Sequence, residues 1–362
     1  MRRNVFIGIL IALAVVLATA ACSASPTATP PPTATVLPPD TPAPPTPTPT
    51  ATPRPVKLVF MAGFQPQANL PFVAAYVAKD KGYFAQEGLD VEIRHSTGQH
   101  LQLLASGDVQ VTTADASSVL KRNLEQSIPI VAVELFGQKG QQAFGVLESS
   151  GIRSPKDWVG KTFGYKTSVP PDYLAILKAE GVDRSKIKEV SVSFDPRVLS
   201  EGKVDILAMF KSNEPDVLRS IGAPVRLFAP EDYGVPTLGL TYIVMQDYLA
   251  TNREVVQRYV KATLRALQDI QADFQGALDI TMRYAPQQQR DHMAFMLRAE
   301  LNDAVGLVTL QAGIGAMMDA QWKAFADSLV EFQALQPKSN LKQAYDASLV
   351  NASYQNGRLV WP

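Results

Sequence analysis

The feature that most constrains the fold is an alternation of short apolar runs with amphipathic segments. Residues 56–64, "VKLVFMAGF", form an apolar run of strand length, and "PFVAAYVAKDKGYFAQEGL" then places apolar side chains on one face at helical spacing. The alternation continues through "DVEIRHS", "SSVLKRNLEQ" and "IPIVAVELF". Strands that alternate with helices are typical of a largely parallel sheet with helices on both faces. We therefore expect an α/β fold.

A second series of the same kind begins near Gln142. "AFGVLESS" indicates a strand, "PDYLAILKAEGV" a helix and "VDILAMF" a further strand, and "LGLTYIVMQDYL" leads out of the series. From Arg253 onward the pattern is helical, with one apolar stripe. A body of this length suits two lobes better than one core. We expect a first lobe over residues 56–141, a second lobe over 142–239, and a return to the first lobe with C-terminal helices over 240–362.

The N-terminal residues indicate export and a lipid anchor. Residues 1–21 contain two arginines, an apolar stretch and small residues, which is the pattern of a secretory signal. The small residues directly before Cys22, the single cysteine, resemble a bacterial lipobox, so we expect Cys22 to be lipidated. An uncleaved membrane anchor and a chance exported thiol are the alternatives. The expected location is the extracytoplasmic face of the cell membrane.

The segment after Cys22 has the composition of a tether. Residues 23–55 contain 13 Pro and 9 Thr among 33 residues and almost nothing large. Such a composition cannot form a core and favours extended polyproline geometry. At about 3.1 Å per residue the tether could reach roughly 100 Å. We therefore assign residues 22–55 to the lipidated cysteine and its tether.

Composition excludes some functions. The chain has 34 Lys and Arg against 34 Asp and Glu, so it lacks the basic excess of a nucleic-acid-binding protein. His95 and His100 have no cysteine or carboxylate at metal-ligand spacing, and we predict them, with His292, to be loop or helix-surface residues and predict no metal site. We expect a monomer without a cofactor.

Five motifs, in order, carry a resemblance to a known family. They are "YVAKDKGYFAQEGLDVEI", "LLASGDVQVTTAD", "DWVGKTFGY", "EGKVDILAMFKSNEP" and "MDAQWKAFADSL". The chain resembles the type-2 periplasmic substrate-binding proteins of ABC importers, in the branch of thiamine-pyrimidine-precursor binders with nitrate, sulfonate and taurine relatives. Within this branch it is most similar to riboflavin-binding lipoproteins. The resemblance covers residues 56 to about 346.

The resemblance implies two α/β lobes joined by two hinge strands, with the ligand in the cleft between them and with a permease and its ATPase as partners. The hinge strands would lie near residues 142–147 and 240–245. Physical reasoning agrees, because open α/β sheets bind ligands beyond the carboxyl ends of their strands. The residues expected to line the cleft follow predicted strands or lie beside the crossings between the lobes. They are Phe64, Gln65, Asn69, Phe72, Thr97, Gln99, Asp115, Ser117, Gln138, Gln142, Tyr165, Thr167, Asn213, Glu214, Tyr233 and Tyr242.

Side-chain amides and aromatic rings dominate this set, and arginine is absent from it. An amide presents a donor and an acceptor together, which suits the ring edge of a pyrimidine or flavin. Aromatic faces suit a flat heterocycle. A sulfonate or nitrate would instead favour cations or helix N-termini, and Lys166 keeps that possibility open. The alternative for the aromatic residues is core packing, and for the glutamines a solvated loop.

Asn213 and Glu214 have two interpretations. They follow the apolar run 204–210 and precede Pro215, so Asn213 could be a helix N-cap with Glu214 favoured by the helix dipole. We predict instead that both face the ligand, with Asp172 a weaker candidate. The expected function is binding and delivery of riboflavin, with a thiamine-type aminopyrimidine or a small anion as alternatives. We do not expect an enzyme, because related pyrimidine synthases use a cysteine-rich motif and this chain has one cysteine.

Overall fold

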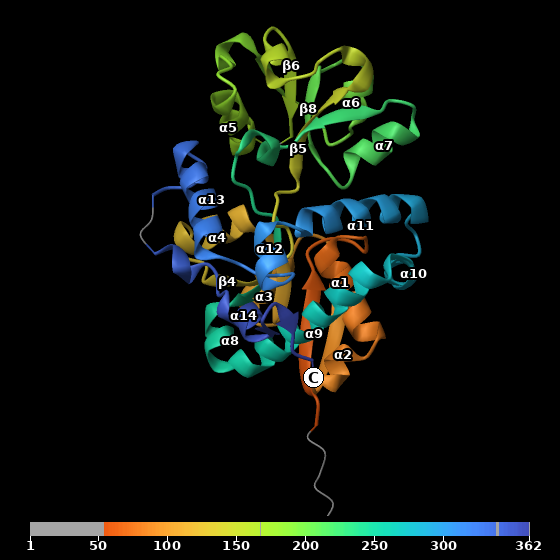
Figure 1. Ribbon diagram of the computed structural model, residues 1–362, viewed down its shortest axis with the longest axis vertical. Coiled ribbons are helices and arrows are strands. Elements are labelled where there is room, and N and C mark those ends of the chain that lie inside the picture. The colour runs from red at the N-terminus through yellow and green to blue at the C-terminus, as the bar shows by residue number, and fades with distance from the viewer. Residues whose placement is uncertain (1–53, 167, 338–339, 362) are drawn as a thin grey trace, which may run out of the picture. The chain divides into compact units, whose positions relative to one another are not determined.

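The computed structural model describes residues 54–166, 168–337 and 340–361. The signal segment, Cys22, nearly all of the predicted tether and Thr167 lie outside the described residues. The body contains two five-stranded mixed sheets, and Figure 1 shows each sheet with helices on both of its faces. Among the described residues, no helix is both long enough and apolar enough to cross a bilayer.

The first sheet has the strand order β2-β1-β3-β10-β4. Strands β1, β2 and β3 run parallel, and β10 is antiparallel to both β3 and β4. The carboxyl ends of β1 to β4 therefore lie at one edge. The strands are β1 (Val56–Ala62), β2 (Leu89–His95), β3 (Val111–Asp115), β4 (Ile130–Leu135) and β10 (Leu240–Met245).

Helices from both ends of the chain cover the first sheet. Its alternating side chains enter two apolar cores, one on each face: Phe60 lies in the first and Met61 in the second. The predicted apolar stripe from Val256 to Leu267 is buried in the first core. The helices of this lobe are α1 (Leu70–Asp80), α2 (Tyr83–Gln86), α3 (His100–Ser106), α4 (Ala116–Leu124), α8 (Gln246–Thr251), α9 (Arg253–Ala272), α10 (Phe274–Tyr284), α11 (Arg290–Ala304), α12 (Leu307–Ala312), α13 (Asp319–Glu331) and α14 (Ser348–Ala352).

The second sheet has the order β7-β6-β8-β5-β9, in which β6, β7 and β8 run parallel and β5 is antiparallel to its two neighbours. Its aromatic core includes Trp158, Phe163 and Tyr173. The strands are β5 (Gln142–Leu147), β6 (Thr162–Tyr165), β7 (Lys188–Ser191), β8 (Ile206–Phe210) and β9 (Val225–Phe228), and the helices are α5 (Pro171–Ala179), α6 (Arg197–Ser200) and α7 (Glu214–Ser220). Short 3-10 turns and the two-residue strands β11 (Tyr354–Gln355) and β12 (Arg358–Leu359) complete the body.

Two crossings join the lobes, and they touch each other. The Gly239 amide donates to the Gly137 carbonyl at 2.9 Å, and a Cβ on Gly137 would lie 2.7 Å from the Gly239 Cα. Only glycine allows this approach, because a side chain on either residue would force the crossings apart. The predicted two-lobed α/β fold is confirmed.

Candidate ligand-binding cleft

A cavity of about 220 Å³ lies on the second lobe, at the carboxyl ends of β6 and β8. This volume is below the ~300 Å³ typical of small-ligand pockets, so loops of the first lobe would have to complete an enclosed site. Strand ends of this kind are where open α/β sheets bind ligands. The lining residues are Gln142, Lys166, Ser168, Pro170, Pro171, Phe194, Ala208, Met209 and Phe210.

Two exposed phenylalanines flank this cavity. Phe194 is 69% exposed and Phe210 is 46% exposed, so both rings leave apolar surface open to solvent. The Lys166 ammonium lies between them, with Nζ 5.5 Å from the Phe194 ring centroid and 5.4 Å from that of Phe210. Both separations are within the range of a cation–π contact. The cavity therefore offers two ring faces and the amide of Gln142.

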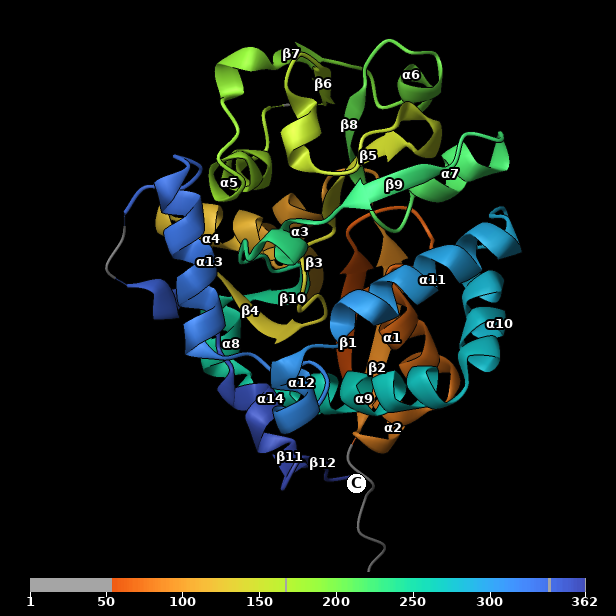
Figure 2. The ribbon, with the colours of Figure 1, turned by 45° about the horizontal axis from the view of Figure 1, so that its top comes forward.

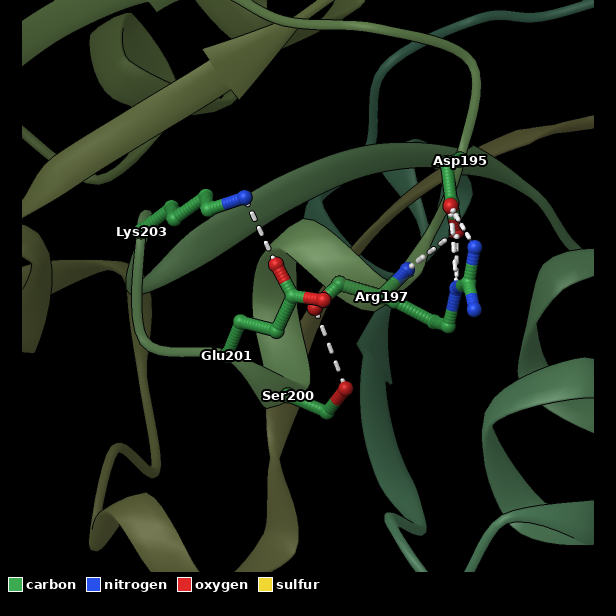
Figure 3. A network of polar contacts seen from close by, with 5 residues as sticks. All are labelled: Asp195, Arg197, Ser200, Glu201 and Lys203. Atoms are coloured by element: carbon green, nitrogen blue, oxygen red, sulfur yellow. Dashed lines mark hydrogen bonds and ion pairs between the residues drawn. The ribbon is translucent and has the colours of Figure 1, made fainter.

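The turn that carries Phe194 is held by the next residues of the chain. The Asp195 carboxylate accepts the Arg197 backbone N–H at 3.0 Å and bonds the Arg197 guanidinium, at 2.9 Å from Nε to Oδ2, as Figure 3 shows. The Arg197 hydrogen bonds lower the pKa of Asp195 to about 2, so this carboxylate is ionised at neutral pH. In Figure 3 the Ser200 hydroxyl also donates to the Arg197 carbonyl, at 3.0 Å. These local bonds fix the turn at the start of α6 and keep Phe194 at the cavity.

Glu214 is buried and already has partners. Its carboxylate forms an ion pair with Lys166 and accepts the Phe210 backbone N–H at 2.9 Å. Glu214 thus joins the two strand ends that border the cavity, and its charge is compensated by Lys166. Pro215 follows as the second residue of α7, where it needs no N–H partner.

Asn213 occupies the N-cap position of α7, but its side chain makes no capping bond. Its Oδ1 lies 3.1 Å from Nε2 of His292 on α11, and Nδ1 of His292 lies 2.7 Å from the Asp216 carboxylate. The capping alternative is therefore wrong for the Asn213 side chain. His292 lies on helix α11 and is partly exposed, as predicted, and it connects α11 to α7; Figure 2 shows these two helices side by side.

Part of the first lobe's predicted set is exposed at the strand ends. Phe64, at 54% exposure, and Gln65 follow β1, and the Gln99 side chain accepts hydrogen bonds from the Thr97 amide at 3.2 Å and hydroxyl at 2.9 Å. These residues leave ring and amide surface open to solvent. We retain them as candidate ligand contacts.

A buried polar network joins the lobes behind this surface. Glu300 of α11 accepts hydrogen bonds from Asn69 Nδ2 at 2.9 Å and from Leu70 N at 3.3 Å in the first lobe. It also accepts from Gln141 Nε2 at 2.8 Å in the crossing and from Ser212 Oγ at 3.2 Å in the second lobe. Burial raises the pKa of Glu300, and these bonds oppose the rise. Asn69 therefore has a structural partner.

Lys211 forms the second connection between the lobes. Its Nζ lies 2.7 Å from the Glu231 carboxylate and 2.9 Å from that of Asp303, at the end of α11. Burial raises the pKa of Asp303 to about 6, against the attraction of Lys211. α11 is therefore bound to the second lobe at both of its ends.

Three predicted site residues have structural roles, and their surroundings give no support to a contact with a ligand. Phe72 and Tyr242 lie in the first apolar core, where the Tyr242 hydroxyl donates to the Pro71 carbonyl. Gln138 donates to the Ala316 carbonyl at 2.9 Å and accepts from Gln321 at 2.8 Å, which uses both ends of its amide. Phe72 lies on α1 and Tyr242 on β10, and Gln138 follows β4 with its side chain bonded to the loop before α13 and to α13 itself.

The positions of the remaining predicted residues neither support nor contradict contact with a ligand. Asp115 caps α4 by accepting the Ser118 N–H at 2.9 Å, and Ser117 donates to the same carboxylate. Tyr165 and Tyr233 pack at the margin of the aromatic core, half-buried. Their contact with a ligand stays a prediction.

Sequence reasoning missed Phe194, Lys211, Glu300 and Asp303. Phe194 comes three residues after the end of β7, so the strand-end rule that selected Phe210's neighbours could have found it. Glu300 and Asp303 are on a helix far along the chain, and no local pattern connects them to the cleft. The described residues also contain no group of three or more His, Cys, Asp or Glu placed to hold a metal ion.

A larger groove, of about 570 Å³, lies between α13 and the segment around Leu335 to Tyr345. Its lining comes from α4, α13 and the segment that follows α13, and it includes no residue at the carboxyl end of a strand. Its lining is mostly aliphatic with surface lysines and aspartates, and it contains a single aromatic residue, Tyr345. We therefore take the smaller cavity, with its paired phenylalanines, as the candidate site.

Because it has two mixed sheets joined by two crossings, with a cavity at the strand ends, the chain has the type-2 periplasmic-binding-protein fold. Solved structures share this fold, including the periplasmic aliphatic sulphonate binding protein SsuA from Escherichia coli, with a TM-score of 0.59, 13% identity and coverage of 81% of this chain and 92% of that one. The desulfurization enzyme DSZB is also similar, with a TM-score of 0.57 and 14% identity over 82% and 98% of the two chains. At these identities the likeness concerns the fold alone.

Residues 69–277 match the family model described as "NMT1/THI5 like", and the chain belongs to this family. It is 27% identical to the riboflavin-binding protein RibY of Chloroflexus aurantiacus over 295 residues, which is 78% of this chain and 83% of that protein. It is 28% identical to a formylaminopyrimidine-binding protein of Halalkalibacterium halodurans over 230 residues, 61% of this chain and 68% of that protein. The family recognised from the sequence motifs is confirmed.

Proposed function

We propose that this protein is the solute-binding component of an ABC importer and that it binds riboflavin for delivery to a membrane permease. The observation that carries the proposal is the pair of exposed rings, Phe194 and Phe210, on either side of a strand-end cavity. The similarity to RibY, a protein named for riboflavin binding, supports the choice of ligand.

Exposed aromatic faces favour a flat ligand. An aromatic contact contributes about 0.5–1.5 kcal/mol beyond the burial of its area. A ring system that covers both phenylalanines would also remove their apolar surface from water, at about 25 cal/mol per Å². The isoalloxazine of riboflavin offers a large flat surface for both effects.

Amides around the cavity suit the edge of such a ring. Gln142 lines the cavity, and Gln65 is exposed in the loop after β1 in the first lobe. Each side chain offers a donor and an acceptor, which matches the alternating carbonyl and N–H groups of a flavin or pyrimidine edge. A thiamine-type aminopyrimidine is the second candidate, favoured by the similarity to a formylaminopyrimidine-binding protein.

We propose that the protein is a binder and does not transform its ligand. The relatives named for riboflavin and formylaminopyrimidine binding support this. The shared fold of DSZB means that the fold alone does not decide the question. Recovery of riboflavin unchanged after incubation, judged by mass spectrometry, is the expected result, and a new product would overturn this part.

A fluorescence titration tests the ligand. Riboflavin emission should fall as the full-length protein is added, because stacking on aromatic rings quenches the flavin, and the curve should give a dissociation constant at or below the micromolar range. Absence of quenching at tens of micromolar protein would reject riboflavin. The same titration with the aminopyrimidine, followed by calorimetry, would then test the second candidate.

The remaining parts of the proposal concern location and partners. We propose that Cys22 anchors the protein by lipid to the extracytoplasmic face of the membrane. The Pro- and Thr-rich residues 23–55 then form a tether that lets a monomeric body reach a permease and its ATPase. The support is the sequence pattern before Cys22 and the tether's composition.

A further inference from the structure

We infer that the cleft is built to exclude anions, so that its ligand is a neutral or cationic molecule and the phosphorylated form of a vitamin is rejected. The inference deepens the proposed function, since it names the charge class of the ligand at that same site. It rests on where the protein's own carboxylates lie.

Anions in proteins are commonly held by the free N–H groups of helix N-termini. At the α7 N-terminus the Glu214 carboxylate is the first helical residue, and it accepts the Phe210 N–H of the preceding strand end. Pro215 supplies no N–H, and Asp216 adds a second carboxylate in the first turn. Glu214 is paired with Lys166 and Asp216 with Arg219, so at this N-terminus the protein's own groups already occupy the place of an anion, and one donor is missing.

The N-terminus of α5 borders the cavity itself. Pro170 and Pro171 both line the cavity, and they occupy the N-cap and first positions of the helix, so neither has an N–H to offer. Asp172 follows in the first turn. Burial and then the neighbouring Glu231 raise the pKa of Asp172, Lys211 opposes the rise, and Asp115 of the first lobe adds to it, so two further carboxylates and one lysine act on Asp172.

In the first lobe, carboxylates also lie at helix N-termini. The Leu70 N–H at the start of α1 is bonded by the Glu300 carboxylate, and the next residue is Pro71. The Asp115 carboxylate caps α4. Each of the four helix N-termini α1, α4, α5 and α7 is therefore supplied with a carboxylate from this chain.

The cations of the site are also occupied. Lys166 is the only cation among the described residues that line the cavity, and it is paired with the buried Glu214. Lys211 is shared between Glu231 and Asp303. A phosphate or sulfonate would have to displace a buried carboxylate from its lysine, which leaves that carboxylate uncompensated.

The test compares ligands that differ only in a phosphate. Riboflavin and riboflavin 5′-phosphate are titrated against the full-length protein at low ionic strength, and the aminopyrimidine alcohol is compared with its phosphate ester in parallel. For whichever of the two unphosphorylated compounds binds, we expect its phosphate ester to bind at least tenfold more weakly. We also expect taurine and methanesulfonate to give no thermal stabilisation at millimolar concentration.

Variants assign the effect to the carboxylates. Asp172→Asn should reduce the ratio between the phosphorylated and free dissociation constants several-fold, whereas Glu254→Gln, at an 88% exposed side chain on α9, should leave the ratio unchanged. Added salt should also shrink the ratio, because screening weakens exposed repulsion.

The two proposals fail differently. Equal binding of riboflavin and its phosphate would overturn the charge inference and leave the riboflavin proposal intact. No binding of riboflavin would reject the proposed ligand, and the aminopyrimidine pair and the anions would still decide the charge class. Micromolar binding of taurine or methanesulfonate would overturn the inference whatever the flavin result.

Discussion

Glu214 illustrates what the sequence shows at the scale of one residue. Its position after an apolar strand and before a proline correctly indicated a strand end next to a helix start. Its partner Lys166 is 48 positions away, so the pairing that neutralises it could not be read locally. Asn69 and Glu300 are separated by 231 positions. Phe72 on α1 and Tyr242 on β10 are buried in the first core, because a position on or near a strand does not decide which face a side chain occupies.

The two exposed phenylalanines give the first prediction. Phe194→Ala and Phe210→Ala should each weaken riboflavin binding about tenfold, the loss expected when a ring contact of ~1–1.5 kcal/mol is removed. Ile221→Ala, at a 52% exposed apolar residue directly after α7, is the matched control and should change affinity less than twofold. Fluorescence titration measures all three, and wild-type affinity in both phenylalanine variants would place the ligand elsewhere.

Glu134 gives a prediction about pH. It is fully buried in β4, with Thr263 Oγ1 donating to Oε2 at 2.8 Å and no described residue bonding Oε1. Burial raises the pKa of Glu134 to about 8. In the unfolded chain Glu134 has the ordinary glutamate pKa of about 4.3 and releases its proton above that pH, whereas the folded protein keeps the proton. The free energy of unfolding should fall as pH rises from about 4.3 to 8, by up to ~1.4 kcal/mol per pH unit.

Urea unfolding between pH 6.5 and 8 lies above the pKa values of about 6 for Asp172 and Asp303, and the Glu134 variant assigns the remaining slope to this group. Glu134→Gln should lose the slope over this window, and Glu254→Gln, on the exposed side of α9, should retain it. A wild-type stability that is constant from pH 6.5 to 8 would show that Glu134 is ionised in the fold.

Elements were predicted better than contacts between them. The apolar stripe of α9 and the alternation in both sheets follow directly from side-chain periodicity, which is why their positions were predicted correctly. The role of α11 did not follow from its sequence. Glu300 is buried and Asp303 half-buried because the first lobe, the crossing and the second lobe all pack beside them, and a solvated helix face has the same composition.

The α11 connection can be tested by a double-mutant cycle. Lys211→Met should lower the free energy of unfolding by about 3 kcal/mol, because it leaves the Glu231 and Asp303 carboxylates facing each other without a cation. Asp303→Asn in the same chain should recover part of that loss, since one of the two charges is removed. Urea unfolding gives the four values, and strictly additive losses would contradict a coupled contact.

At the scale of the whole molecule, the two crossings and the proposed tether set what the body can do. Hinge bending at a few crossing residues would bring the loops of the first lobe over the cavity of the second. The contact between Gly137 and Gly239 keeps the two crossings together during such a motion. The tether would then keep the closed body near the membrane while leaving its orientation free.

The anchor is testable in cells. Cys22→Ser should abolish metabolic labelling with a palmitate analogue and move the protein from the membrane fraction to the soluble extracytoplasmic fraction. A Ser23→Ala control should behave as wild type. Continued membrane association of the Cys22 variant would indicate that residues 1–21 remain as an uncleaved anchor.

A crystal structure of the protein with riboflavin would show whether the cavity between Phe194 and Phe210 is the binding site. We expect an isoalloxazine ring against Phe194 and Phe210, with amides of Gln142 and of the loop after β1 at its edge and the Lys166–Glu214 pair intact. A flavin in the groove beside α13, or a phosphate or sulfonate on Lys166 with Glu214 displaced, would contradict it.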